Sequence, residues 1–183
     1  MTASLLPDRL VLTALVLAAA VGALALMRWG WVRRAGRQRD VEPPPAVPPL
    51  PSASGAADLT GVEARYLGAN RSGDWLDRVV VHGLGAPSDA VVSVRTGGDP
   101  AGVWLLRRGA PDLYLPADRV LGARHDRAAA GRAVERDALV VVEWLLGHSA
   151  IELGLRVRDP ARAEELRCAV AALSAPSAAG GSR

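Results

Sequence analysis

The order of apolar and polar residues divides the chain into a membrane-like N-terminal run and a C-terminal part with the pattern of short strands. Residues 10–27 contain neither a charge nor a proline. At about 1.5 Å rise per helical residue, this run spans roughly 27 Å, close to the roughly 30 Å hydrocarbon core of a bilayer. The pattern predicts one N-terminal transmembrane helix.

Basic and aromatic residues follow this apolar run at once. Trp29 and Trp31 lie where an interfacial aromatic belt belongs. Only Arg9 precedes the run, whereas the arginines that follow it are Arg28, Arg33, Arg34, Arg37 and Arg39. By the positive-inside bias, residues 1–39 anchor a single-pass protein of the inner (plasma) membrane with its C-terminal domain in the cytoplasm. The arginine flank would contact anionic lipid headgroups.

Two further interpretations of the apolar run stay open. Ala23-Leu24-Ala25 is similar to a signal-peptidase site, although a cleaved signal normally carries its positive charge before the apolar run. Ala14, Ala18 and Gly22 recur every four residues, and small residues at this spacing let two membrane helices approach closely. A homo-oligomer is therefore one prediction from this segment.

A proline-rich segment, residues 40–60, separates this helix from the remainder. Its prolines are Pro43, Pro44, Pro45, Pro48, Pro49 and Pro51. We interpret the segment as a linker in polyproline II conformation that holds the domain roughly 25 to 30 Å from the membrane. The alternative is a PxxP ligand for an aromatic groove, from Pro45 to Pro48 or from Pro48 to Pro51.

Residues 61–173 have the pattern of a mainly β domain. Short valine-rich runs are broken by turn residues about every ten positions, which predicts about seven strands. The expected strands are 64–67, 79–82, 90–95, 103–107, 119–124, 139–146 and 151–158. The last has the clearest period of two and should bury one face and expose the other, which carries Glu152, Gly154, Arg156 and Arg158.

A helix should follow these strands. Asp159 is suited to its N-cap and Pro160 to its first position. Ala163, Leu166, Val170 and Leu173 then form one apolar face, which should cover an open end of the β-structure. Residues 174–183 are expected to be a disordered tail. The outline is a seven-stranded barrel or sandwich of the pleckstrin-homology-like (PH-like) type, capped by a C-terminal helix and preceded by one transmembrane helix.

Several strings resemble a family of actinobacterial single-span membrane proteins with a PH-like domain. They are Tyr66-Leu67-Gly68, Gly73-Asp74-Trp75-Leu76-Asp77-Arg78-Val79, His82-Gly83-Leu84-Gly85, Gly122-Ala123-Arg124 and Gly131. Members are sometimes labelled transporter or export protein. The resemblance implies fold and topology, with no ligand or catalytic residue to carry over.

Charge argues against nucleic acid as a partner. The chain has a formal charge of +3, but residues 61–173 hold 15 arginines and 15 acidic residues. A nucleic-acid-binding domain should carry a basic stripe of its own. The chain contains no lysine, which excludes a P-loop or Schiff-base lysine.

Candidate binding residues concentrate between positions 74 and 85. Asp74 and Asp77 could do acid and base work, or could close a turn and form a local ion pair with Arg78. Trp75 is either a core anchor or a binding aromatic. With His82 and, further along the chain, Arg124, these residues make up the predicted binding region.

The remaining reactive side chains show no catalytic or metal-binding pattern. His82, His125 and His148 are scattered without metal-ligand spacing, and Cys168 is expected to be buried as a small hydrophobe. Five arginines could line an anion site but are better explained as solvated loop charges: Arg107, Arg108, Arg124, Arg127 and Arg132. We expect no cofactor, no metal and no catalytic residue.

These patterns predict a membrane-anchored cytoplasmic adaptor that binds another, unidentified protein and is not an enzyme. A strand edge or the region 74–85 would be the contact surface. The alternative is an accessory subunit of a transporter or export system, and a third hypothesis is an enzyme using Asp74 and Asp77.

Overall fold

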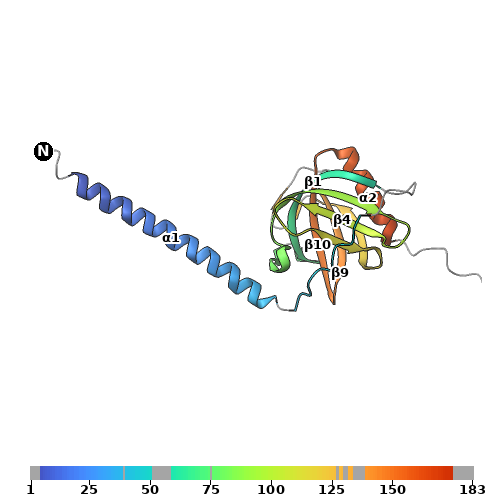
Figure 1. Ribbon diagram of the computed structural model, residues 1–183, viewed down its shortest axis with the longest axis horizontal. Coiled ribbons are helices and arrows are strands. Elements are labelled where there is room, and N and C mark those ends of the chain that lie inside the picture. Colours follow the sequence, from blue (N-terminus) through green and yellow to red (C-terminus); the bar gives the residue numbers. More distant parts are fainter. Residues whose placement is uncertain are drawn as a thin grey trace, which may run out of the picture. The chain divides into compact units, whose positions relative to one another are not determined.

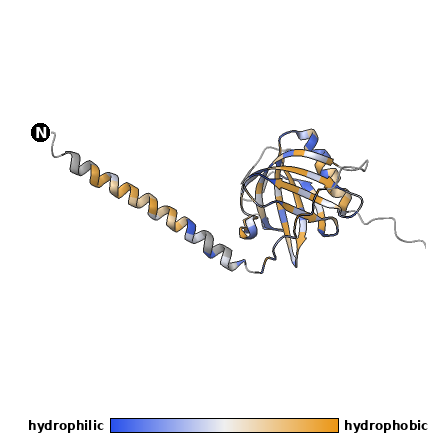
Figure 2. Ribbon diagram, viewed as in Figure 1, coloured by the Kyte–Doolittle hydropathy of each residue, from blue (hydrophilic) through white to orange (hydrophobic). Residues whose placement is uncertain are grey.

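The computed structural model describes residues 5–38, 40–50, 59–74, 76–126, 128–129, 132–133 and 139–174. The chain forms two compact units, Met1–Arg39 and Asp40–Arg183. The first contains helix α1, Leu5–Arg37 (Figure 1). Within α1, Leu10–Gly30 is long and apolar enough to cross a membrane, and its side chains are exposed. Figure 2 shows apolar residues along this stretch.

The second unit is an antiparallel β-structure organised around one long strand. Strand β1, Leu59–Arg71, pairs with β3 (Ser88–Arg95) along its first part and with β10 (Ser149–Val157) along its second part. The register with β10 shifts between Tyr66 and Gly68. Such a bulge bends a strand and lets it pass from one half of a sheet to the other.

The sheet has eight strands in the order β5-β4-β3-β1-β10-β9-β6, with β2 paired to β1. The strands not yet given are β2 (Arg78–Val79), β4 (Gly102–Arg107), β5 (Leu113–Pro116), β6 (Val120–His125) and β9 (Leu139–Leu146). A separate hairpin consists of β7 (Ala128–Ala129) and β8 (Arg132–Ala133). The predicted mainly β fold with a C-terminal helix is confirmed.

Two details of the strand prediction are wrong. The strand expected at 79–82 is replaced by β2, which ends at Val79, and by a 3-10 turn, Val81–Gly83. His82 has a φ of 54°, in the left-handed region, which is incompatible with a strand. The other detail is β5, which was not predicted; it leads through a second 3-10 turn, Ala117–Arg119, into β6.

The core fills the space between the two halves of the sheet. Its largest fully buried side chains include Tyr66, Leu105, Trp144, Leu153 and Leu155. Full burial of each aliphatic side chain of this size contributes about 1.5 to 3 kcal/mol. The residues of β10 that were expected to be buried are buried. Of the residues expected to be exposed, Arg156 and Arg158 are exposed, whereas Glu152 and Gly154 are buried.

Helix α2, Pro160–Ser174, covers one end of the β-structure (Figure 1). The carboxylate of Asp159 accepts the N–H of Ala161 at 3.0 Å, which is the predicted N-cap. The predicted apolar face is confirmed, because Ala163, Leu166 and Val170 are fully buried in the core.

Residues 40–50 form neither helix nor strand, yet they pack against the β-structure of the same unit. Val41 is 3% exposed and belongs to the core, and the carbonyl of Pro48 accepts the indole N–H of Trp104 at 3.0 Å. The expectation that this segment stands free as a spacer is therefore wrong for residues 40–50, because the sheet supplies contacts that composition alone does not reveal. Residues 51–58 lie outside the described residues.

Candidate functional site

Asp74 closes the turn between β1 and β2. Its Oδ1 accepts the backbone N–H of Leu76 at 2.9 Å and of Asp77 at 3.3 Å, and its own N–H donates to the carbonyl of Arg71 at 3.2 Å. These contacts form an Asx-type turn, which is the structural alternative to a catalytic role for Asp74. Leu76 is 61% exposed at the tip of the turn, and Trp75 lies outside the described residues.

Asp77 forms an ion pair with Arg71. Its Oδ2 lies 3.1 Å from Nε of Arg71, whose Nη2 also donates to Asp40 at 2.6 Å. The hydrogen bond from Arg71 holds the pKa of Asp40 below its usual value. The guanidinium of Arg71 therefore forms ion pairs with both Asp77 and Asp40, and so connects the turn to the start of the proline-rich segment.

Arg78 donates to a backbone carbonyl of β1 and to a backbone carbonyl of the loop at 74–85. Its Nη2 donates to Leu67 at 3.2 Å and to Gly85 at 2.7 Å. Gly85 packs so closely that an added Cβ would lie 2.9 Å from Cα of Val80. The glycine is therefore required by packing, and Arg78 stabilises that packed loop from within.

His82 joins the 3-10 turn to the proline-rich segment. Its Nε2 lies 3.0 Å from the carbonyl of Val41, whose side chain enters the core. The structure thus brings Asp74, Asp77, Arg78 and His82 into one loop, and the contacts described for each stabilise the fold of that loop.

Arg107 supports the loop from the inside of the β-structure. Its Nη1 donates to Gly83 at 3.1 Å and its Nε to Pro111 at 2.6 Å, while its guanidinium lies 4.8 Å from the ring centre of Tyr66. The Tyr66 hydroxyl donates to the carbonyl of Leu84 at 2.6 Å. Burial raises the pKa of Tyr66 and lowers the pKa of Arg107. Both groups brace the loop.

Arg124 lies on β6 and belongs to a different group of polar side chains. Its Nη2 is 3.1 Å from Oε2 of Glu152 and 3.3 Å from Asp126. The hydroxyl of Ser72 contacts Oε1 of Glu152 at 3.2 Å and also the carboxylate of Glu143. We call these five residues the acidic cluster. Ser72, the residue after β1, lies in the same turn as Asp74.

Glu143 and Glu152, neither of which is among the predicted binding residues, are direct partners across β9 and β10. The usable signal was the two-residue turn Gly147-His148, which pairs Leu146 with Ser149 and so fixes the register of the whole hairpin. Of the other arginines considered for an anion site, Arg127 and the side chain of Arg132 lie outside the described residues.

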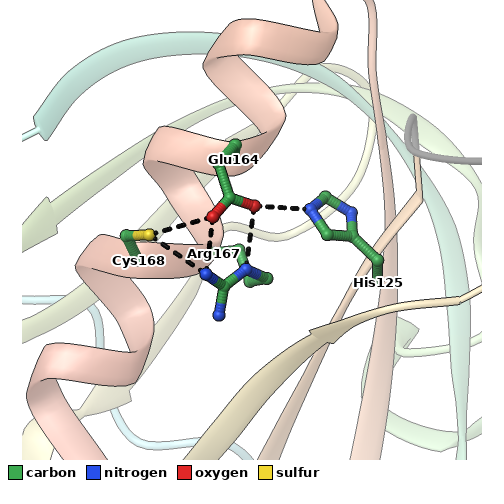
Figure 3. A network of polar contacts seen from close by, with 4 residues as sticks. All are labelled: His125, Glu164, Arg167 and Cys168. Atoms are coloured by element: carbon green, nitrogen blue, oxygen red, sulfur yellow. Dashed lines mark hydrogen bonds and ion pairs between the residues drawn. The ribbon is translucent and has the colours of Figure 1, made fainter.

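A third polar group connects β6 to α2 (Figure 3). Glu164 accepts from Arg167 at 2.6 Å, lies 2.8 Å from Nε2 of His125, and accepts the thiol of Cys168 at 3.2 Å. The hydrogen bonds from Arg167 and His125 lower the pKa of Glu164, and the hydrogen bond to Glu164 raises the pKa of the Cys168 thiol. Cys168 is exposed, so its predicted burial is wrong: Leu166 and Val170 on either side face the core.

Helix α1 carries the residues predicted to meet the membrane surface. The guanidinium of Arg33 lies 4.3 Å from the ring centre of Trp29, a cation–π contact at the C-terminal end of the apolar stretch. Arg28 is exposed. The side chains of Trp31 and Arg34 lie outside the described part of the chain.

Among the described residues, no group of three or more His, Cys, Asp or Glu side chains could hold a metal ion. A family model described as Bacterial PH domain-like matches residues 44–171. The match begins in the proline-rich segment, includes the eight-stranded sheet and ends within α2. No curated protein matches the chain. Because the family model covers more than half of the 183 residues, the chain belongs to the bacterial PH domain-like family.

Proposed function

We propose that this protein is a membrane-anchored adaptor whose PH-like domain binds a protein partner at the cytoplasmic face of the inner membrane. PH-like domains are generally non-catalytic binding modules. The apolar stretch Leu10–Gly30 supports the anchor, and the arginines that follow it, among them Arg28 and Arg33, support the orientation.

The polar contacts at 74–85 favour binding over catalysis. The carboxylate of Asp74 accepts hydrogen bonds from backbone N–H groups of its own turn, and the carboxylate of Asp77 forms an ion pair with Arg71. A general base needs a carboxylate free to approach a substrate proton. The contacts of these two aspartates therefore support a structural role for both.

The observation that carries the proposal is an apolar pair on the outer face of the sheet. Val91 of β3 and Leu106 of β4 are direct cross-strand partners, and they are 40% and 41% exposed. Their neighbours Val92 and Leu105 point into the core, so the exposed pair lies on the opposite face. We call this surface, formed by Val91, Ser93, Trp104, Leu106 and Tyr114, the outer β3–β5 face.

A pair of adjacent exposed aliphatic side chains is a favourable place for a protein to dock. Each Å² of apolar surface removed from water contributes about 25 cal/mol, and neighbouring side chains can be covered together by one partner. On the same face, Trp104 and Tyr114 lie beside this pair along β4 and β5, but both side chains are buried.

Photo-crosslinking in intact cells tests the contact surface. A photoreactive residue in place of Leu106 should give a reproducible protein adduct, identified by mass spectrometry, whereas the same residue in place of Arg156, exposed on β10, should not. A variant carrying Val91→Ser and Leu106→Ser should lose the partner, and Leu121→Ser, at an exposed leucine of β6, should keep it. Equal adducts at positions 106 and 156 would contradict the proposal.

The single cysteine of the chain tests anchor and orientation. A membrane-impermeant maleimide should label Cys168, which is exposed, only after the cells are permeabilised. In a Cys168→Ser background, Ser4→Cys places the thiol before the apolar stretch and should be labelled in intact cells. Labelling of Cys168 in intact cells, or a mature chain that has lost the N-terminal segment, would overturn this part of the proposal.

A further inference from the structure

Exposure along the proline-rich segment repeats every three residues. Pro43, Ala46 and Pro49 are exposed, whereas the pairs Pro44–Pro45 and Val47–Pro48 are partly buried. A polyproline II helix has three residues per turn, so a segment in this conformation that lies on a surface exposes every third residue. This spacing is the one expected of a polyproline II segment that packs against the domain.

The surface beneath it is the aromatic part of the outer β3–β5 face. Trp104 lies outside the core cluster, between core residues Val103 and Leu105, and yet is fully buried. Its ring centre is 4.7 Å from that of Tyr114, with the planes inclined by 44°. Its Nε1 donates to the carbonyl of Pro48 at 3.0 Å. An aromatic floor with a donor to a backbone carbonyl is a general way of recognising polyproline II segments.

We propose that the Trp104–Tyr114 pair is a recognition site for proline-rich segments, occupied in cis by residues 44–48, and that the protein partner carries a proline-rich segment that displaces them. The inference rests on the proposed adaptor function and names the chemistry of its partner. The hydrogen bond uses a backbone carbonyl as its acceptor, and a proline-rich segment of a separate chain can supply the same acceptor.

Two features decide the competition between residues 44–48, which we call the cis segment, and the proline-rich segment of a partner. A ligand in the same chain has an effective concentration in the mM range, so it suppresses a weaker external ligand. The exposed surface of Val91 and Leu106, on the same face, offers a partner contacts that remain open with the cis segment in place. A partner that uses both surfaces gains the additional free energy it needs to displace residues 44–48.

The test measures binding of a fluorescent peptide with the sequence of residues 43–51 to the full chain in lipid nanodiscs. Pro45→Asp with Pro48→Asp should release the cis segment, because both prolines are partly buried. Pro43→Asp with Pro49→Asp is the matched control, with the same charge change at exposed positions. We expect at least tenfold tighter peptide binding to the first variant than to the wild type or the control.

Two further arms test the recognition chemistry. Trp104→Phe, added to the released variant, keeps a ring but removes the N–H donor and should weaken peptide binding severalfold. A peptide with aspartate at positions 45 and 48 should not bind. Absence of peptide binding to the released variant, or equal affinity for all the proteins, would overturn the inference.

A melting curve establishes first that each variant is folded. If the released variant does not fold, Pro48→Ala takes its place, and the same order of affinities is expected. The assay contains no cellular partner, so its failure leaves crosslinking from position 106 as an independent test of the adaptor function.

Discussion

Removal of the Arg124 guanidinium should destabilise the domain at neutral pH, because it leaves two facing carboxylates without the cation that pairs with one of them. Arg124 Nη2 lies 3.1 Å from Glu152, and Glu143 is the direct cross-strand partner of Glu152. Both carboxylates also contact the hydroxyl of Ser72, which has a single proton to donate. Like charges directly opposite each other destabilise a sheet.

The magnitude follows from the distance and the exposure of the pair. Two unit charges about 4 Å apart attract each other by about 4 kcal/mol at an effective dielectric constant of about 20. The side chains of Arg124 and Glu152 are 45% and 11% exposed, so solvent and side-chain entropy remove much of this attraction. We expect a net coupling free energy of about 1 to 2 kcal/mol between the two residues.

A double-mutant cycle measures this coupling. The free energy of unfolding is obtained from urea titrations of the wild type, Arg124→Ala, Glu152→Gln and the double variant, followed by the fluorescence of buried Trp104 and Trp144. Glu152→Gln removes the charge and keeps the side-chain volume and an acceptor for Ser72. Arg156→Ala, at an exposed arginine of β10, is the control and should change stability by less than about 0.5 kcal/mol.

The salt dependence separates an ionic coupling from lost packing. Added salt screens ion pairs that are open to solvent, and the side chain of Arg124 is 45% exposed. The coupling should therefore shrink when the titrations are repeated at about 1 M sodium chloride, where the Debye length is about 3 Å. A coupling smaller than about 0.3 kcal/mol at low salt, or one of equal size at both salt concentrations, would refute the reasoning.

Four further outcomes are expected. Leu153→Ala should lower the free energy of unfolding by about 3 kcal/mol, because Leu153 is fully buried. Leu145→Ala, at a side chain that is 36% exposed, should lower it by about 1 kcal/mol in the same urea titration. Equal losses would contradict the assigned burial. Gly102→Ala should lower the melting temperature by several degrees, since Gly102 has a φ of 153° and an added Cβ would lie 2.2 Å from a carbonyl oxygen of β5. Glu164 has a lowered pKa in the folded state, so its contribution to the stability of the fold is fully present above its ordinary pKa of 4.5 and is lost as the pH falls below that value. Glu164→Gln should therefore reduce the fall in melting temperature below pH 4.5. An unchanged pH profile would exclude this contribution. Glu164→Ala should also speed alkylation of Cys168 at pH 7, because the hydrogen bond that raises the thiol pKa is removed; an unchanged rate would show that Glu164 does not control the thiol.

Local sequence patterns predicted those parts of the fold that depend on contacts between residues close together in the sequence. The N-cap at Asp159 and the apolar face of α2 follow from residues a few positions apart, and both are confirmed. The strand at 139–146 was also found, because a continuous valine-rich run is typical of a buried strand. In these places, sequence neighbours and spatial neighbours are nearly the same.

The candidate site was less predictable, because its contacts join distant parts of the chain. The alternation of β10 suggests that Glu152 is exposed, but Arg124 of β6 and Ser72, in the turn after β1, contact its carboxylate. Proline content suggested a free spacer, and the same composition also suits a docked ligand. The hydrogen bond between Trp104 and Pro48, 56 residues apart in sequence, favours the docked arrangement.

The sharing of β1 between the two halves of the sheet has a consequence for how the domain comes apart. One part of this strand pairs with β3, which continues into β4 and β5 of the sheet. The other part pairs with β10, which continues into β9 and β6. Without β1, each three-stranded remnant would have a bare edge and half a hydrophobic interior, which is a template for aggregation. The two halves should therefore melt together in one all-or-none transition, and any truncation that removes β1 should yield insoluble protein.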